Sequence, residues 1–227
     1  MILRRIWTVF LCISLMILPV EARGPAVALT FDDGPSGRFT SRLLDGLGDE
    51  NVPATFLLCG YRMEAYPELT ARIAREGHEI GLHGWSHRNL QYLSRRDIAR
   101  ELADTRALVP PGVPVRWLRP PGGLTTPSLR QVARARQLSI LLWSVDPRDW
   151  AVDNPGEIVE RIVEKVDDGD VILMHDMTDA SVDAALEVVS RLKKAGFRFL
   201  TVSELAKLHS IPLRPGVEYK SFPQKEP

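Results

Sequence analysis

The sequence has few cysteines, no block of like charge and no hydrophobic run as long as a membrane span. Two cysteines in 227 residues are too few for a disulfide scaffold. The 29 basic and 29 acidic side chains balance, which argues against a nucleic-acid binder and against a strongly acidic or basic tail protein. A hydrophobic content of 44% excludes a disordered chain and allows one folded domain with a substantial core.

The N-terminus has the pattern of an export signal. Arg4 and Arg5 precede an uncharged apolar run over Ile6–Leu18, and small residues stand before a cleavage point after Ala22. The run would be about 20 Å long as a helix, shorter than the roughly 30 Å hydrocarbon core of a bilayer. We therefore expect residues 1–22 to be a cleaved signal peptide. The protein would be secreted or periplasmic without a stable membrane partner; an uncleaved membrane anchor is the alternative.

Short apolar runs alternate with segments of helical spacing between residues 25 and 205. The expected strands are residues 26–31, 54–58, 79–82, 115–118, 139–145, 170–174 and 198–202. The expected helices are residues 38–50, 67–77, 94–109, 126–137, 155–167 and 180–195. This alternation is typical of parallel strands joined by crossover helices, and so of an α/β fold. Seven strands in about 180 residues favour one small barrel, complete or incomplete, over two domains.

We expect the folded domain at residues 25–208 and a C-terminal tail at residues 209–227. The tail contains proline and lysine and lacks periodicity, which is typical of an extended or frayed end. No linker, repeat or low-complexity segment interrupts the domain.

Ionisable side chains directly follow five of the expected strands. They are Asp32 and Asp33, His83 and His87, Arg119, Asp146 and Asp149, and His175 and Asp176. The carboxyl ends of parallel strands meet on one face of a sheet or barrel, where active sites lie. The sequence therefore predicts that these residues share one site.

Two histidines and an aspartate pair form a candidate metal site. His83 and His87 are four residues apart and can converge on one ion, on a helix or in a short loop around Gly84. Adjacent carboxylates such as Asp32 and Asp33 repel each other and need a cation if they are buried. Alone, the histidine pair is weak evidence and the aspartate pair also fits an exposed turn. Together they predict a three-ligand divalent site with an open position, with one aspartate left over to act as a base.

Taken singly, several residues also have ordinary structural interpretations. Asp146–Asp149 fits a solvated turn, Arg119 a surface position, and Trp150 and Leu173 core packing. His78 begins a strand at its amino end, away from the proposed site, and we interpret it as structural.

Five motifs occur in a fixed order along the chain. They are Thr30–Pro35 (TFDDGP), His83-x-x-x-His87, Arg119–Gly123 (RPPGG), Asp146-x-x-Asp149-Trp150 and Leu173-Met174-His175. This order resembles the five-motif signature of the polysaccharide deacetylases of carbohydrate esterase family four, the chitooligosaccharide-deacetylase-like proteins. The resemblance covers about residues 25–205. It implies a distorted (β/α) barrel, usually with seven parallel strands, and a catalytic domain over residues 25–208.

The resemblance also implies how the metal and the attacking water are handled. Asp33, His83 and His87 would hold a divalent metal, most often zinc. Asp32 would be the general base, and Arg119 would pair with Asp32 and orient it.

The same resemblance implies roles for the residues around the acetyl group. His175 would be the general acid, and Asp149 would tune its basicity. Trp150 and Leu173 would line the pocket for the acetyl methyl group, and the backbone N–H near Gly122 would help to stabilise the oxyanion.

The chain departs from the family pattern at two places. Leu82 stands where the family often has Asn, and Gly122 stands where Tyr is frequent. Neither change removes a ligand or a catalytic group, and both bear on substrate preference. We also interpret Trp85 and Trp150 as exposed tryptophans that could stack on sugar faces.

We expect an exported, metal-dependent hydrolase that removes N-acetyl groups from glycans containing N-acetylglucosamine, such as peptidoglycan, chitin-type glycans or exopolysaccharide. O-acetylated xylan is a further possible substrate. The alternatives are a non-catalytic glycan-binding barrel of the same fold and a hydrolase of non-carbohydrate amides. The complete set of ionisable residues argues against the first, and the motif order with the export signal argues against the second.

Overall fold

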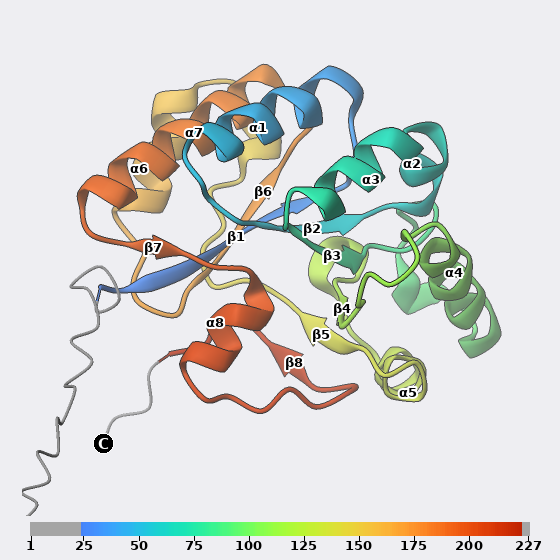
Figure 1. Ribbon diagram of the computed structural model, residues 1–227. Helices are drawn as coiled ribbons and strands as arrows, with labels where there is room; N and C mark the ends of the chain where they lie inside the picture. The colour runs from blue at the N-terminus through green and yellow to red at the C-terminus, as the bar shows by residue number, and fades with distance from the viewer. Residues whose placement is uncertain (1–23, 224–227) are drawn as a thin grey trace, which may run out of the picture.

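The structure is a computed structural model that describes residues 24–223 (Figure 1). The signal peptide expected at residues 1–22 lies outside the described residues. Within residues 24–223, no helix has the length and apolar character needed to cross a membrane.

The expected strands and helices are all present, most of them with shorter bounds. The strands are β1 (Ala26–Asp32), β2 (Thr55–Leu58), β3 (Glu79–Leu82), β4 (Trp117–Leu118), β5 (Ser139–Leu141), β6 (Val171–His175), β7 (Arg198–Phe199) and β8 (Glu218–Tyr219). The helices are α1 (Gly37–Asp49), α2 (Gly60–Ala65), α3 (Pro67–Arg75), α4 (Arg95–Ala107), α5 (Pro127–Ala135), α6 (Pro155–Val163), α7 (Asp179–Lys194) and α8 (Val202–Leu208). Three single 3₁₀ turns are η2 (Leu90–Tyr92), η3 (Pro121–Gly123) and η4 (Asp149–Ala151). The short elements α2, α8 and β8 were not expected from the sequence.

The strands form one curled sheet whose paired strands are all parallel. The order is β6-β1-β2-β3-β4-β5-β8, and β7 pairs with the first residues of β1. Beyond β5, Val145 bridges to Ile172 of β6, which links the β5 side of the sheet back to its other edge. Helices lie outside the curve, with α6, α7, α1 and α3 along one side and α4 and α5 beside them (Figure 1). The predicted distorted (β/α) barrel is confirmed.

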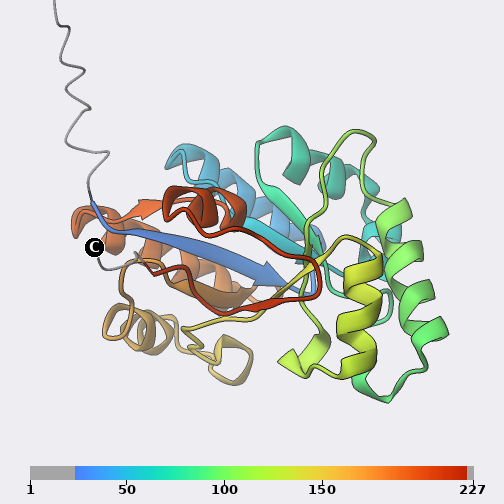
Figure 2. The same ribbon diagram turned by 90° about the horizontal axis from the view of Figure 1, so that it is seen from below.

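Strand β1 lies at the centre of the molecule, with helices on both sides (Figure 2). All seven of its residues are buried. Val27, Leu29 and Phe31 pack in the cluster that includes the apolar faces of α1 and α7. The alternating small residues Ala26 and Ala28 pack in the barrel interior with Trp117, Leu141 and Val171. Because both faces of the strand are covered, its sequence is a nearly continuous apolar run.

The C-terminal segment is extended but not frayed over its described part. Tyr219 in β8 pairs with Leu141 in β5, and Phe222 is fully buried. The rings of Tyr219 and Phe222 stack with centroids 5.6 Å apart, and Phe222 contacts Trp117 edge-on at 6.0 Å. Of the two expected alternatives, extended or frayed, these residues adopt the extended one, because two aromatic side chains complete the core at the open side of the barrel.

A half-buried carboxylate at the amino end of the barrel gives a first test of the fold. Glu79 of β3 accepts hydrogen bonds from Trp117 Nε1, Thr55 Oγ1 and the backbone N–H of Ser203, each at 3.1 Å. Replacing it by alanine removes the acceptor of Thr55 Oγ1 and of the Ser203 N–H and leaves Trp117 Nε1 with Ser203 Oγ alone, at 3.1 Å. We expect Glu79→Ala to lower the free energy of unfolding by about 2–4 kcal/mol, or the melting temperature by about 5–15 °C. Thermal and urea unfolding measure the loss.

The matched control for this prediction is Glu187→Ala on the exposed face of α7. That change is expected to leave the unfolding free energy within about 0.5 kcal/mol. Equal stability of the two variants would show that the Glu79 hydrogen bonds contribute nothing net to the fold.

Candidate active site

The carboxyl ends of four strands supply the ionisable residues of the site. Asp32 is the last residue of β1 and lies in register with His175, the last residue of β6. His83 follows β3 directly, and Arg119 follows β4. The parallel arrangement therefore gathers residues that are up to 143 positions apart in the sequence at one edge of the sheet.

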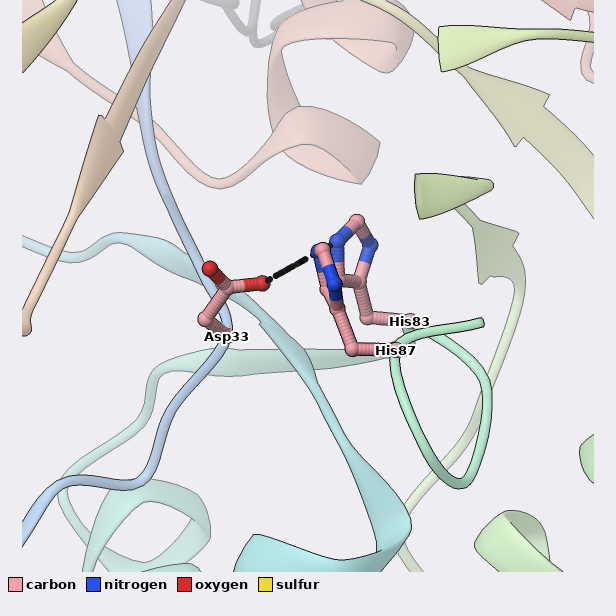
Figure 3. Close-up of side chains that lie close together, drawn as sticks. All are labelled: Asp33, His83 and His87. Carbon is pink, nitrogen blue, oxygen red and sulfur yellow. Dashed lines mark ion pairs between the residues drawn. The ribbon is translucent and has the colours of Figure 1, made fainter. Parts of the chain in front are cut away.

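Asp33, His83 and His87 form a cluster with the spacing of metal ligands. Asp33 Oδ1 lies 3.3 Å from His83 Nε2 and 3.1 Å from His87 Nε2. One ligand atom from each of the three residues lies within 4.8 Å of the others. Figure 3 shows the three side chains pointing toward one another from two separate loops.

The local backbone turns these side chains together. Asp33 and His87 have φ of 73° and 56°, and Gly84 between the two histidines has φ of 80°. Left-handed conformations are uncommon for residues other than glycine, and they cluster at functional sites. Cys59, the residue after β2, is buried, and its Sγ lies 3.9 Å from the carbonyl oxygen of His83.

A hydrogen bond on the other ring nitrogen fixes the orientation of His83. Its Nδ1 lies 2.7 Å from the backbone carbonyl oxygen of Arg119, which can only accept, so Nδ1 carries the proton. The lone pair of Nε2 then faces Asp33. Histidine ligands of metals typically show this arrangement, with one nitrogen on a carbonyl and the other on the ion.

The electrostatics of the cluster fit a divalent cation. Asp33 Oδ1 is buried and has no hydrogen-bond partner of good geometry within residues 24–223, despite the two close imidazole nitrogens. Burial alone would raise the pKa of Asp33, but His83 and His87 hold it well below its ordinary value. The carboxylate of Asp33 in turn raises the pKa of His87. One carboxylate oxygen and two imidazole nitrogens are a donor set that suits zinc and similar divalent metals.

Asp32 lies beside the cluster but is held by a different partner. Its Oδ1 accepts a hydrogen bond from Arg119 Nη1 at 2.7 Å, and its Oδ2 lies 3.8 Å from His83 Nε2. Both Asp32 and Arg119 are buried. Arg119 also donates to Thr30 Oγ1 at 2.8 Å and to the carbonyl oxygen of Leu142 at 2.9 Å. These contacts orient Asp32 so that one carboxylate oxygen stays available on the side of the histidines.

His175 and Asp149 form a second pair at the site. His175 Nδ1 lies 2.8 Å from Asp149 Oδ1, and the backbone N–H of His175 donates to Asp149 Oδ2 at 2.8 Å. Burial lowers the pKa of His175, but Asp149 and the carboxylates of Asp32 and Asp33 outweigh it and raise the pKa to about 9. His175 is therefore protonated at neutral pH. The pair with Asp149 uses Nδ1, so the proton on Nε2 takes no part in it.

The three residues expected to contact substrate lie in different environments. Leu173 is buried in β6, whereas Trp150 in η4 is 66% exposed, which excludes the core interpretation for this tryptophan. Gly122 in η3 has φ of 71°, a conformation that favours glycine. Their contacts with an acetyl group remain predictions.

Three other residues have structural positions. Trp85 is half-buried and its ring covers Gly60, so the expectation of an exposed Trp85 is wrong. His78 is buried at the amino end of β3, and its Nδ1 accepts a hydrogen bond from Ala54 N at 3.1 Å, which agrees with the structural interpretation. Asp146 accepts from the backbone N–H of Arg148 at 2.8 Å, as in a turn.

Two further residues lie near the site: Trp143, which was not singled out from the sequence, and Asp176, which was expected there because it follows an expected strand. The ring of Trp143 lies over Arg119, with the guanidinium carbon 5.7 Å from the ring centroid. A Cβ at Gly123 would lie 2.7 Å from this ring, so Gly123 leaves the room that Trp143 occupies. Asp176 is fully buried, accepts a hydrogen bond from Thr40 Oγ1 and has its pKa raised to about 7 by burial.

Glu101 of α4 holds the loop that carries both histidines. Its Oε2 accepts hydrogen bonds from the backbone N–H groups of Trp85 at 2.7 Å and Ser86 at 3.1 Å, and its Oε1 accepts from Ser86 Oγ at 3.0 Å. Nothing in the sequence links this helical glutamate to the site. We expect Glu101→Ala to weaken metal binding by about 10–100-fold, because the loop then loses the contacts that orient its ligands.

Competition with a chromophoric chelator measures the dissociation constant for zinc in this test. Asp104→Ala, which changes an exposed carboxylate one turn further along α4, is the matched control. An affinity of Glu101→Ala equal to that of the control would show that the loop keeps its shape without Glu101.

The fold and the site define a class of protein. The sequence profile of the family described as "Polysaccharide deacetylase" matches residues 20–141, which is more than half of the chain. The chain belongs to this family, as the five motifs predicted.

Individual relatives support the same assignment. The chain is 37% identical over 83% of its length to the peptidoglycan-N-acetylmuramic acid deacetylase PdaC of Bacillus subtilis, of which it spans 40%. It is 34% identical to the chitooligosaccharide deacetylase of Sinorhizobium fredii, with 88% of this chain and 91% of the relative covered. Among solved structures, a family 4 acetyl xylan esterase from Clostridium thermocellum in complex with a cobalt ion superposes with a TM-score of 0.81 at 32% identity, covering 87% of this chain and 99% of the other.

Proposed function

We propose that this protein hydrolyses the N-acetyl groups of a glycan containing N-acetylglucosamine, with a divalent metal held by Asp33, His83 and His87. The observation that carries the proposal is that the two adjacent aspartates have different partners. Asp33 faces both imidazoles within 3.3 Å, whereas Asp32 is fixed by Arg119 and is left outside the ligand set. A ligand set with a separate base beside it is the arrangement that metal-assisted amide hydrolysis requires.

The residues around the ligand set supply the proton transfers. A bound divalent cation would lower the pKa of water and polarise the acetyl carbonyl group. Asp32 accepts the proton of the attacking water, and Arg119 keeps its carboxylate in place. The water oxygen bonds to the carbonyl carbon, the carbon–nitrogen bond breaks, and acetate and a free amine are formed. His175 donates its Nε2 proton to the leaving nitrogen, and Asp149 holds its ring.

The remaining predicted residues bind the acetyl group. Leu173 and Trp150 are proposed to line the pocket for its methyl group. The backbone N–H near Gly122 is proposed to donate to the oxygen that becomes negatively charged during attack.

We further propose that residues 25–208 are the catalytic domain and that the protein is secreted or periplasmic. Peptidoglycan and chitooligosaccharides are the first substrates to test, because the names of the relatives print them. Zinc is the metal that best suits the one-carboxylate, two-imidazole donor set.

Acetate release from a panel of acetylated glycans tests the proposed function. We expect acetate from peptidoglycan strands or chitooligosaccharides, loss of activity after treatment with a chelator, and recovery on addition of zinc. Acetylated xylan and a small cyclic imide serve as the competing substrates. Glycan binding without acetate release would instead support the non-catalytic barrel, and turnover of the imide alone would support a hydrolase of non-carbohydrate amides.

A further inference from the structure

The carboxylate of Asp176 lies buried beside the candidate site and has no role in the proposed reaction. The side chain is fully buried, and its Oδ1 has no hydrogen-bond partner among residues 24–223. Burying a carboxylate oxygen without a partner costs free energy, so such a group in a folded protein calls for an explanation. Asp33 Oδ1, the other unpartnered carboxylate oxygen of the described chain, is explained by the candidate ligand set.

The other buried side-chain atoms that lack a partner within residues 24–223 lie away from the site. They are His78 Nε2 and His209 Nδ1. His78 directly precedes β3, and the ring of His209 lies 3.7 Å from the carboxylate of Asp168, which precedes β6. Both are at the amino ends of the strands, whereas the candidate site is at the carboxyl ends. In the described part of the chain, Asp176 is therefore the unpartnered group at the site that the proposed reaction does not explain.

The sheet places Asp176 next to the turn that carries Asp33. Asp32 and His175 are in register at the ends of β1 and β6, and Asp33 and Asp176 are the residues that follow them. At Asp33 the chain leaves the strand direction, with φ of 73°. The side chain of Asp33 faces the histidines, and that of Asp176 is buried against the turn that follows Asp33.

One contact of Asp176 with this turn is a chain of two hydrogen bonds. Its Oδ2 accepts a hydrogen bond from Thr40 Oγ1, and Thr40 Oγ1 accepts from the backbone N–H of Ser36 at 2.6 Å. Thr40 lies in the second turn of α1 and is fully buried. The end of the turn, where α1 begins, is thus linked to the segment after β6.

The second contact is direct packing against Gly34. A Cβ at Gly34 would lie 2.6 Å from Asp176 Oδ1 and 2.8 Å from Oδ2, so only glycine leaves room for the carboxylate. The carbonyl oxygen of Gly34 accepts a hydrogen bond from the backbone N–H of Cys59 at 3.1 Å. Gly34 is therefore held between Asp176 and the residue after β2, and Asp33 is its direct neighbour in the chain.

We propose that Asp176 is a positioning residue of the metal site. Through Thr40 and Gly34 it fixes the turn that follows Asp33. The carboxylate of Asp33 is thereby held close to both imidazoles, as a shared divalent cation requires. The inference rests on the ligand set of the proposed function and adds a residue that orients it.

The affinity for zinc, measured by competition with a chromophoric chelator, is the first test. Asp176→Ala is expected to weaken zinc binding by about 10–100-fold, as the loss of a contact that orients a ligand does. Asp176→Asn fills the same space and can accept from Thr40 through its amide oxygen, so its affinity is expected within about threefold of the wild type. Asp49→Ala changes an exposed carboxylate at the far end of α1 and is the matched control with unchanged affinity.

A double-mutant cycle tests the contact with Gly34. Gly34→Ala places a methyl group against the carboxylate of Asp176 and is expected to weaken zinc binding by about tenfold or more. In the Asp176→Ala background the space is free, so the same change is expected to cost less than about twofold. Losses that multiply in the double variant would show that the two residues act independently, and the proposal would be wrong.

A second variant keeps the test decisive if Asp176→Ala does not fold, which circular dichroism of the metal-free protein shows. Thr40→Val keeps the shape of the side chain and removes the hydroxyl group that links Asp176 to Ser36. It is expected to weaken zinc binding by about 5–20-fold. Thr40→Ser keeps the hydroxyl group and is expected to retain the affinity. Equal affinities of the valine and serine variants would contradict the proposed link.

Zinc affinity and acetate release together separate this inference from the proposed function. Weaker zinc binding by Asp176→Ala and Thr40→Val supports the inference even if the wild-type protein releases no acetate. Wild-type zinc affinity in Asp176→Ala overturns the inference, whether or not the protein is a deacetylase. A wild-type protein that binds no zinc would overturn the ligand set and this inference with it.

Discussion

Asp32→Asn is expected to lower kcat for deacetylation by about 10³–10⁴-fold while the protein keeps its metal. Asparagine preserves the shape of the side chain and can still accept a hydrogen bond from Arg119, but it cannot take a proton from water. The metal should remain because Asp33, not Asp32, faces His83 and His87. Steady-state acetate release and metal content of the purified variant measure the two effects.

Two further variants make this result specific. Asp33→Asn is expected to lose both metal and activity, in contrast to the neighbouring change. Since Arg119 is buried, Asp32→Asn also leaves its charge without a carboxylate, and the fold must be checked by circular dichroism at the assay temperature. Near-wild-type rates for Asp32→Asn would contradict its role as the base, and loss of metal would make it a ligand.

His175→Ala is expected to lower kcat by about 10²–10⁴-fold, again with the metal retained. An amine is a poor leaving group unless it is protonated, and His175 is the residue with a proton to donate. A substrate with a good leaving group that needs no proton, such as an activated aryl acetate, should be affected far less. Equal losses on the two substrates would remove the general-acid role from His175.

The pH dependence of kcat tests the Asp149–His175 pair. A general acid must be protonated, so activity should fall as pH rises through the pKa of His175, which is about 9 without a bound cation. The positive charge of a metal moves this pKa downward, so the alkaline limb lies at or below pH 9. Asp149→Asn removes the negative charge that raises the pKa, and we expect the limb to move to lower pH by one unit or more. An unchanged limb would show that another group controls it.

The periodicity of the sequence predicted the order of strands and helices, but it did not predict how the barrel is completed beside β5. Strand β1 is a continuous apolar run, and the helices begin at recognisable caps such as Ser94, whose side chain accepts from Asp97 N. The short elements were not predicted, because α2 has only six residues and β8 only two, too few to show a periodic pattern. In the tail, the only indication of packing was the pair of aromatic residues Tyr219 and Phe222, which stand in a segment without periodicity. Their role depends on a gap beside β5 that no local pattern reveals.

The residue types alone were likewise enough to name the candidate ligands, whereas the separate roles of Asp32 and Asp33 were only implied by the resemblance to the family. The chain itself shows two adjacent aspartates and two histidines four apart. That Asp33 faces the histidines follows from its left-handed backbone, and that Asp32 does not follows from Arg119, 87 residues away. Glu101 holds the loop of the two histidines through contacts across the fold, and its ordinary position in a helical segment gave no sign of this role.

The amino-acid sequence by itself determined the α/β class, the family and the identity of the residues that gather at the strand ends, because these depend on local periodicity and on motif order. Only the tertiary structure decided which carboxylate oxygen faces which imidazole nitrogen and which tryptophan is exposed. These depend on the curvature of the sheet and on backbone turns of a few residues, and such geometry arises from packing between segments that are distant in the chain.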